Sequence, residues 1–92
     1  MEKKPLVSII INCHNGEKFL SNCIQSILKQ TFKNYEIIFF DNQSTDRSKE
    51  IIKNYKDRRI RYFFSKKFLK LYAARNKALK KCKGTYVCFC DT

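Results

Sequence analysis

The sequence predicts an α/β fold in which helices flank a parallel sheet. Four short apolar runs rich in β-branched or aromatic residues alternate with three segments whose apolar residues have helical spacing. The 92 residues include only two glycines and one proline. Strands that alternate this closely with helices favour right-handed crossovers and therefore a parallel sheet. We expect a Rossmann-like strand order of 3-2-1-4, with ligands bound at the carboxyl ends of the strands.

The individual elements follow from local patterns. Residues 17–30 place their apolar side chains on one face of a helix. Ser44 or Thr45 is expected to cap the second helix, and a third helix over 71–82 is expected to stop at Gly84 as its C-cap signal. The predicted strands are 6–11, 35–40, 59–64 and 85–90.

Charge is the most unusual feature of the composition. Lys+Arg 20 against Asp+Glu 8 gives a net charge of +12, which attracts nucleotide phosphates, nucleic acid or acidic lipid headgroups. The lysines are scattered, and a solubility role accounts for them equally well. The densest pieces, 66–70 and 80–83, lack the aromatic platform of RNA-binding motifs, which disfavours a nucleic-acid partner. Peripheral association with an anionic membrane is retained as an expectation.

Localisation is expected to be cytoplasmic, with the inner membrane face as the place of any peripheral association. No apolar run approaches the ~20 residues that span a bilayer, and the start of the chain lacks a signal-peptide cleavage site. The five cysteines have no C-x-x-C spacing, and four of them fall in predicted strands or helices. Reduced, mostly buried thiols are therefore expected.

The loop after the first predicted strand is a candidate ligand loop. It contains neither G-x-G-x-x-G nor a P-loop, yet it leads into a helix whose first N–H groups favour a nearby anion. His14 is expected to stack on a base rather than to carry protons, with an ordinary loop histidine as the alternative. Glu17 fits a ligand contact and the first helical turn equally well.

Two aspartates and one arginine complete the candidate site. Asp41 ends an apolar strand and, partly desolvated, could accept a hydrogen bond from a base or cap its own turn. Arg75 lies on the helix face that should be buried, where a phosphate, Asp41 or Asp91 would be its partner. A salt bridge that ties this helix to the sheet is the alternative. Asp91 also ends a strand, and one carboxylate alone is a weak metal site.

Several motifs follow one another along the chain. They are V-S-I-I-I-N-C-H-N-G-E at 7–17, S-I-L-K-Q-T-F at 26–32, Y-E-I-I-F-F-D-N-Q-S-T-D at 35–46, A-A-R-N at 73–76 and K-G-T-Y-V-C-F-C-D at 83–91. In this order and at these separations they resemble family 2 glycosyltransferases of the GT-A fold. The resemblance covers the chain from Pro5 onward. It identifies residues 1–92 as a single incomplete domain, the nucleotide-binding half, which ends inside the family's D-x-D metal motif.

The resemblance also implies roles for individual residues. Asn12 and His14 match positions that line the base pocket, and His14 stands where a tyrosine commonly stacks on uracil. Asp41 matches the carboxylate that binds the base, and Arg75 matches the arginine near the base and phosphates. Asp91 matches the first D-x-D aspartate, which reaches Mg²⁺ or Mn²⁺ indirectly.

The chain departs from the family pattern at three places in the expected site. Asn12 stands where proline is frequent, and Asn42 and Gln43 replace the usual Asp-Gly. Leu71 and Tyr72 fill a stretch that is often rich in Gly and Ser, which could narrow the pocket or alter donor choice.

The function implied is that of a nucleotide-sugar-binding segment in an inverting glycosyltransferase. Its donor would be a UDP-sugar, and its acceptor a saccharide or lipid-linked sugar in polysaccharide biosynthesis. No catalytic base is assigned within the 92 residues; it is expected beyond Thr92, so the fragment alone is expected to be inactive. The alternatives are a non-catalytic nucleotide-binding or interaction domain and a basic nucleic-acid binder, whose affinity would fall steeply with salt.

Overall fold

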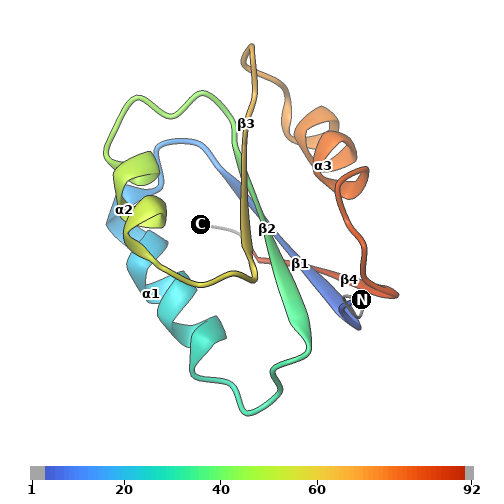
Figure 1. Ribbon diagram of the computed structural model, residues 1–92. Helices are drawn as coiled ribbons and strands as arrows, with labels where there is room; N and C mark the ends of the chain where they lie inside the picture. Colours follow the sequence, from blue (N-terminus) through green and yellow to red (C-terminus); the bar gives the residue numbers. More distant parts are fainter. Residues whose placement is uncertain (1–3, 91–92) are drawn as a thin grey trace.

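The sheet consists of four parallel strands in the computed structural model, which describes residues 4–90. The order is β3-β2-β1-β4, so the predicted 3-2-1-4 arrangement is confirmed (Figure 1). β1 and β2 pair along their whole length, from Val7 opposite Tyr35 to Cys13 opposite Asp41. The strands are β1 (Val7–Cys13), β2 (Tyr35–Asp41), β3 (Ile60–Phe64) and β4 (Tyr86–Phe89).

Three helices cover the sheet from both sides. α1 (Glu17–Leu28) and α2 (Ser48–Asn54) lie on one face, and α3 (Leu71–Leu79) lies on the other (Figure 1).

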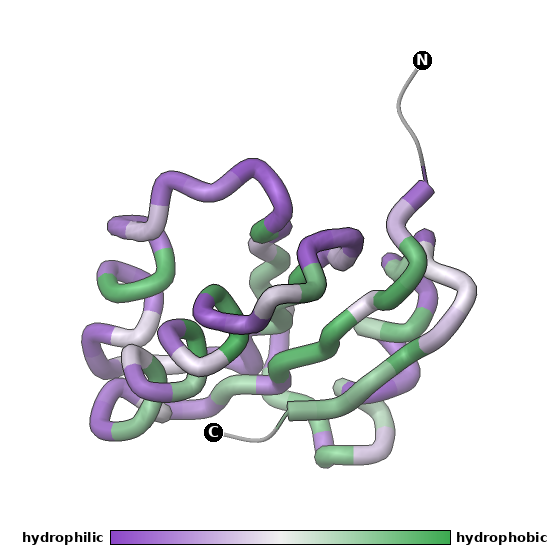
Figure 2. The backbone as a smooth tube through the Cα atoms, turned by 90° about the horizontal axis from the view of Figure 1, so that it is seen from below, coloured by the Kyte–Doolittle hydropathy of each residue, from purple (hydrophilic) through white to green (hydrophobic). Residues whose placement is uncertain are grey.

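Alternation along β2 explains why both faces need a cover. Ile37 and Phe39 belong to the core under α1 and α2, whereas Ile38 and Phe40 pack with the small buried residues of α3. The strands accordingly form the hydrophobic centre in Figure 2, while the loops and outer helical turns are largely hydrophilic. β2 is buried at every position, as expected for a central parallel strand.

The predicted cap of α2 was wrong. α2 begins at Ser48 with Arg47 at the N-cap position, where no side-chain cap forms. Ser44 Oγ instead accepts a hydrogen bond from the Asn15 backbone N–H at 2.9 Å. Thr45 N donates to Asn15 Oδ1 at 2.7 Å. Ser44 and Thr45, which the local pattern assigned to the cap of α2, therefore contact a loop about 30 residues away in the chain.

Gly84 is not a helix cap either. α3 ends at Leu79, and Gly84 lies against β1, where its N–H donates to Ser8 Oγ at 2.8 Å. A Cβ at position 84 would stand 2.7 Å from Ser8 N and 2.8 Å from the carbonyl carbon of Val7. Glycine is required here because two backbone segments approach each other closely.

Replacing Gly84 by alanine is therefore expected to lower the free energy of unfolding by about 1–3 kcal/mol. The added methyl group meets backbone atoms of β1, which cannot rotate away as a side-chain end could. Urea unfolding followed by circular dichroism measures the effect, with the exposed neighbour Lys83→Ala as control. Equal urea midpoints for the two variants would show that the close approach imposes no constraint.

All five cysteines are free thiols. Cys13 is buried, and Cys23 Sγ of α1 lies 3.0 Å from Cys90 Sγ at the end of β4. Burial and the hydrogen bond with Cys90 raise the pKa of Cys23 to about 12, so this thiol stays protonated at neutral pH. The expected burial of Cys88 was wrong, because β4 is an edge strand whose four residues are all exposed.

Within residues 4–90, no helix combines the length and the apolar character that crossing a membrane requires.

Candidate functional site

The loops after β1 and β2 are tied together at the carboxyl edge of the sheet. Full pairing of the two strands places both loops side by side. The Oδ1 atom of Asn15 accepts hydrogen bonds from Thr45 N and, at 3.2 Å, from Asp46 N. Gly16 N donates to Ser48 Oγ at 3.0 Å. These contacts hold the two loops, together called the rim, in one arrangement.

Asp46 joins the starts of two helices. Its carboxylate accepts the first N–H of α1, from Glu17 at 3.1 Å, and the first N–H of α2, from Ser48 at 2.9 Å. Burial raises the pKa of Asp46, but the hydrogen bonds from Ser48 and Glu17 outweigh it, and the net pKa is lowered. The first N–H groups of α1 were expected to favour an external anion. The first of them, from Glu17, instead donates to the Asp46 carboxylate of the protein itself.

Glu17 lies in the first turn of α1, as one of its two predicted interpretations required. Its carboxylate faces the exposed Arg47 guanidinium at 3.7 Å. Such an exposed pair contributes little stability. Glu17 stands outside the hollow described next.

A hollow of about 160 Å³ opens where β1 ends and α3 begins. It contains two of the predicted site residues, Asn12 and His14, beside side chains that the sequence analysis did not select. Its lining consists of Asn12, Cys13, His14, Asn42, Phe68, Leu69, Leu71 and Ala74.

His14 presents an exposed ring to this hollow. Its Nδ1 lies 2.7 Å from the carbonyl oxygen of Asn42, and because a carbonyl only accepts, Nδ1 carries the proton. Nε2 lies 3.5 Å from the side-chain amide nitrogen of Asn15. The ring meets Phe68 edge to face, with centroids 4.8 Å apart. Position 14 therefore presents a ring that is held in place at the mouth of the hollow.

Asn42 and Gln43, the two departures from the family's Asp-Gly, hold the loop over 65–70. Asn42 Nδ2 donates to Leu69 O at 2.7 Å, and Leu69 N donates to Asn42 Oδ1 at 2.9 Å. Gln43, with a left-handed φ of 60°, donates through Nε2 to Ser65 O. The substituted residues thus place Phe68 and Leu69 beside the rim.

Sequence reasoning missed these lining residues for identifiable reasons. Asn42 was noted only as a departure, and Phe68 stood in a segment selected for its lysines. Asn42 and its partner Leu69 lie 27 residues apart in the chain, so no local sequence pattern reveals this contact. Two departures from the family pattern were the available signals: the doublet at 42–43, and Leu71, which was expected to narrow the pocket and does line the hollow.

Asp41 differs from the expectation that it faces the crevice. It is 0% exposed, accepts the Tyr62 hydroxyl on Oδ2 at 2.6 Å and accepts Ser44 N on Oδ1 at 3.0 Å. Burial and this bond raise the pKa of Tyr62, which stays a neutral donor. Asp41 therefore supports the rim from beneath, and it does not line the hollow. The Asp41 carboxylate was expected to be partly exposed, but it is covered by Tyr62, which comes from the neighbouring strand β3.

Arg75 is half-buried on α3, and its Cζ lies 5.1 Å from the ring centroid of Phe89 on β4. The predicted role of Asp91 concerns a residue outside the described range. Between residues 4 and 90, no three His, Cys, Asp or Glu side chains are grouped to hold a metal ion. The expected metal site, with Asp91 as an indirect ligand, therefore stays a prediction.

Comparison with known proteins gives one consistent result. Residues 8–92 match the family model described as Glycosyl transferase family 2. An uncharacterized glycosyltransferase of Haemophilus influenzae is 43% identical over 90 residues, which is 96% of this chain and 36% of that protein. In Escherichia coli, the UDP-Glc:alpha-D-GlcNAc-diphosphoundecaprenol beta-1,3-glucosyltransferase WfaP is 42% identical over 87 residues, or 95% of this chain and 35% of that protein.

Solved structures support the same fold. The crystal structure of S. aureus TarS 1-349 in complex with UDP-GlcNAc superposes with a TM-score of 0.85 at 27% identity. The match covers 94% of this chain and 26% of TarS 1-349. The predicted partial GT-A architecture is confirmed. The chain spans about a third of the length of its curated relatives.

Proposed function

Because the chain belongs to glycosyl transferase family 2, we propose that it forms the nucleotide-sugar-binding part of an inverting glycosyltransferase. The observation that carries the proposal is the hollow at the carboxyl edge of the sheet, where Asn12, His14 and Phe68 converge. A UDP-sugar is the proposed donor, since TarS was crystallised with UDP-GlcNAc and WfaP is named for UDP-Glc.

Each residue has a separate role in the proposal. The exposed His14 ring offers a stacking face for the base. Asn12 contributes a polar side chain to the same hollow. Arg75, which does not line the hollow, is proposed as a source of positive charge for the diphosphate, as the family resemblance implies. Asp41 and Glu17 act from outside the hollow, Asp41 through its contact with Ser44 and Glu17 through its backbone N–H, which donates to Asp46.

The proposed reaction requires groups beyond those described. Mg²⁺ or Mn²⁺, held in part through Asp91, would supply the positive charge that stabilises the departing diphosphate. We propose that the acceptor, a saccharide or lipid-linked sugar, and the base that activates its hydroxyl bind in the part of the full-length relatives that this chain does not match. The 92 residues would then hold a donor without transferring sugar.

Titration of the chain with UDP in a calorimeter tests the donor site. We expect saturable binding that is stronger for UDP than for GDP or ADP. His14→Ala is expected to weaken it about tenfold, because base stacking on a ring contributes roughly 1–3 kcal/mol. Gln25→Ala, exposed on α1, is the matched control.

Two results would contradict the proposal. The first is UDP binding that is absent or equally affected by His14→Ala and Gln25→Ala. The second concerns transfer: continuous release of UDP from UDP-glucose by the 92-residue chain would refute the claim that it only holds the donor.

A further inference from the structure

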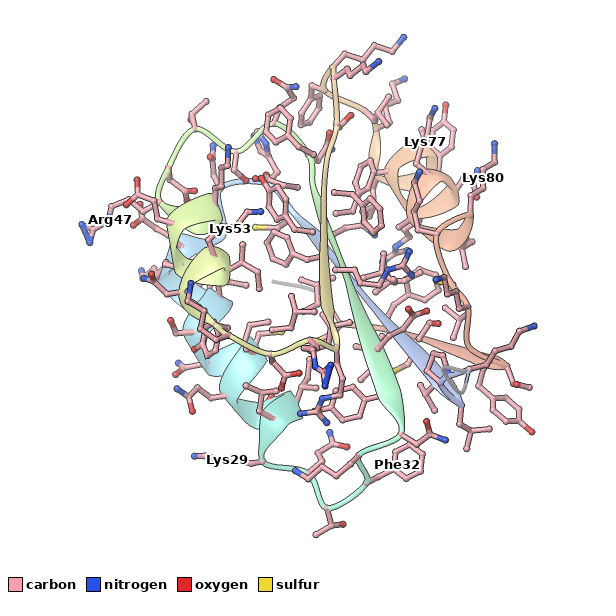
Figure 3. All side chains as sticks on the ribbon, viewed as in Figure 1. Lys29, Phe32, Arg47, Lys53, Lys77 and Lys80 are labelled. Carbon is pink, nitrogen blue, oxygen red and sulfur yellow. The ribbon has the colours of Figure 1, made fainter. Side chains whose placement is uncertain are left out.

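The basic residues of this chain are strongly segregated. Residues 58–90 contain no Asp or Glu, although they hold eleven of the 20 Lys and Arg residues. This segment forms β3, α3 and β4. The sequence analysis treated the lysines as scattered, but folding gathers many of them on the α3 side of the sheet. Figure 3 shows Lys77 and Lys80 projecting from α3, away from α1 and α2.

The two densest lysine pieces of the sequence meet at one cavity, here called the lysine-rimmed hollow. It measures about 620 Å³ and lies between β3 and α3. Its apolar floor consists of Phe40, Phe63, Phe64 and Leu69. Its rim carries Lys66, Lys67, Lys77 and Lys81. Within the described part of the chain, every charged residue that lines it is a lysine.

The floor and rim are combined in a way that suits an amphiphile. Phe64, at the end of an edge strand, is 49% exposed. The Lys81 ammonium lies 5.2 Å from the Phe63 ring centroid, so a rim cation lies over an aromatic ring of the floor. An exposed aromatic side chain inside a ring of cations matches a phosphate headgroup together with the first carbons of its acyl chains.

We propose that the lysine-rimmed hollow docks onto the surface of an anionic phospholipid bilayer, with its rim lysines against the lipid phosphates. Clusters of four or more basic residues at an apolar surface are typical of proteins that bind such membranes. The inference rests on the proposed function, because docking on the bilayer would bring the donor site to lipid-linked acceptors. Leu69 lines both hollows, so the two sites lie next to each other at the same edge of the sheet.

A single-stranded nucleic acid fits this hollow less well. Bases bind such surfaces by stacking on open ring faces. The Phe63 ring already has the Lys81 ammonium and, at 5.3 Å from its centroid, the Arg61 guanidinium. Of the other floor residues, Phe40 is buried and Leu69 is aliphatic, which leaves Phe64 as a single exposed ring rather than a row of stacking platforms.

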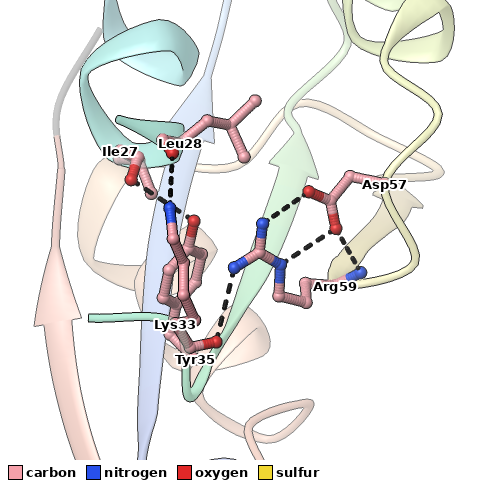
Figure 4. A network of polar contacts seen from close by, with 6 residues as sticks. All are labelled: Ile27, Leu28, Lys33, Tyr35, Asp57 and Arg59. Carbon is pink, nitrogen blue, oxygen red and sulfur yellow. Dashed lines mark hydrogen bonds and ion pairs between the residues drawn. The ribbon is translucent and has the colours of Figure 1, made fainter. Parts of the chain in front are cut away.

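A second basic cavity, of about 800 Å³, lies at the opposite end of the sheet and provides the control. In this cavity, Arg59 Nη2 lies 2.7 Å from Asp57 Oδ2, and Lys33 Nζ donates to Leu28 O at 3.0 Å (Figure 4). These cations are engaged by the protein itself. Lys4 and Arg58 also line this cavity, and both are exposed.

Vesicle co-sedimentation tests the proposal. Vesicles of equal parts phosphatidylglycerol and phosphatidylcholine should bind the chain, and pure phosphatidylcholine vesicles should not. Lys66→Glu/Lys67→Glu should weaken binding about tenfold or more. The matched variant Lys4→Glu/Arg58→Glu makes the same change in net charge and should weaken binding much less. Phe64→Ser should also weaken it, at unchanged charge.

Each outcome decides the question. Equal losses in the two double variants, or no binding to anionic vesicles, would overturn the proposal. Full retention by Phe64→Ser would overturn the part assigned to the floor. A single-stranded oligonucleotide that binds more tightly than the vesicles and displaces them would favour nucleic acid instead. UDP titration of the same samples keeps the tests separate, because vesicle binding without UDP binding would contradict only the donor site.

Discussion

Replacing Glu36 by alanine is expected to lower the free energy of unfolding by about 2–4 kcal/mol, because hydrogen-bond donors inside the fold lose a charged acceptor while Arg61 stays partly exposed. The side chain is 5% exposed and connects three parts of the fold. Oε2 accepts the Ser8 hydroxyl and the Lys83 backbone N–H, both at 2.6 Å, and Oε1 accepts Arg61 Nη1 at 2.8 Å. Alanine would leave these three donors without their shared acceptor.

Urea unfolding followed by circular dichroism measures this loss. Glu50→Ala is the matched control, because Glu50 is an exposed carboxylate on α2 and should change stability by no more than about 0.5 kcal/mol. Similar urea midpoints for the two variants would mean that the Glu36 network contributes nothing beyond an exposed charge.

The Glu36 contribution should also depend on pH. Burial raises the pKa of Glu36, but hydrogen bonds from Ser8, Lys83 and Arg61 outweigh burial and leave the folded-state pKa lowered. A lowered pKa stabilises the fold above the unfolded-state value and loses that effect as pH falls through the folded-state value. The stability difference between wild type and Glu36→Ala should therefore be largest near neutral pH and shrink below about pH 4. A pH-independent difference would contradict this.

Asp41→Ala is expected to weaken UDP binding about tenfold or more and to lower the unfolding free energy by about 1–3 kcal/mol. Its carboxylate accepts hydrogen bonds from Tyr62 of β3 and from Ser44 of the rim, and the change would leave these two half-buried donors without that acceptor. Ser44 in turn holds Asn15, so the disturbance reaches the loop that positions His14. Calorimetry measures the UDP affinity and urea unfolding the stability.

Tyr62→Phe distinguishes two ways in which Asp41 could act. If the carboxylate only positions the rim, loss of the Tyr62 hydroxyl should weaken UDP binding. If it binds the base directly, the freed Oδ2 should leave binding unchanged or stronger. Unchanged UDP binding in Asp41→Ala itself would remove Asp41 from the proposed site altogether.

The parallel sheet could be predicted because its determinants are local. The apolar run at 35–40 is buried at every position, and the run at 6–11 is buried or half-buried from Val7 onward. The helices between such runs dictate parallel crossovers. The predicted caps failed for the opposite reason. Ser44 and Thr45 contact Asn15, and Gly84 packs on Ser8, so distant segments determine these positions.

The candidate site was only partly predictable from the sequence. Spacing and resemblance selected Asn12 and His14, which do line the hollow. They also selected Asp41, but the hydroxyl of Tyr62 that covers it comes from another strand and left no trace in the local pattern. Phe68 reaches the site because Asn42 binds the backbone of Leu69, a pairing of side chain and main chain that spacing alone does not reveal.

The interlocked rim has a thermodynamic consequence. Ordering one residue of backbone costs about 1–2 kcal/mol of conformational entropy, and the Asn15 and Asp46 contacts meet that cost during folding, before any ligand arrives. A small molecule that enters the hollow therefore meets a scaffold that is already rigid, and its association should carry little entropic penalty from the loops. Variation at positions such as Phe68 or Leu71 can then change which molecule is accepted while the scaffold stays intact.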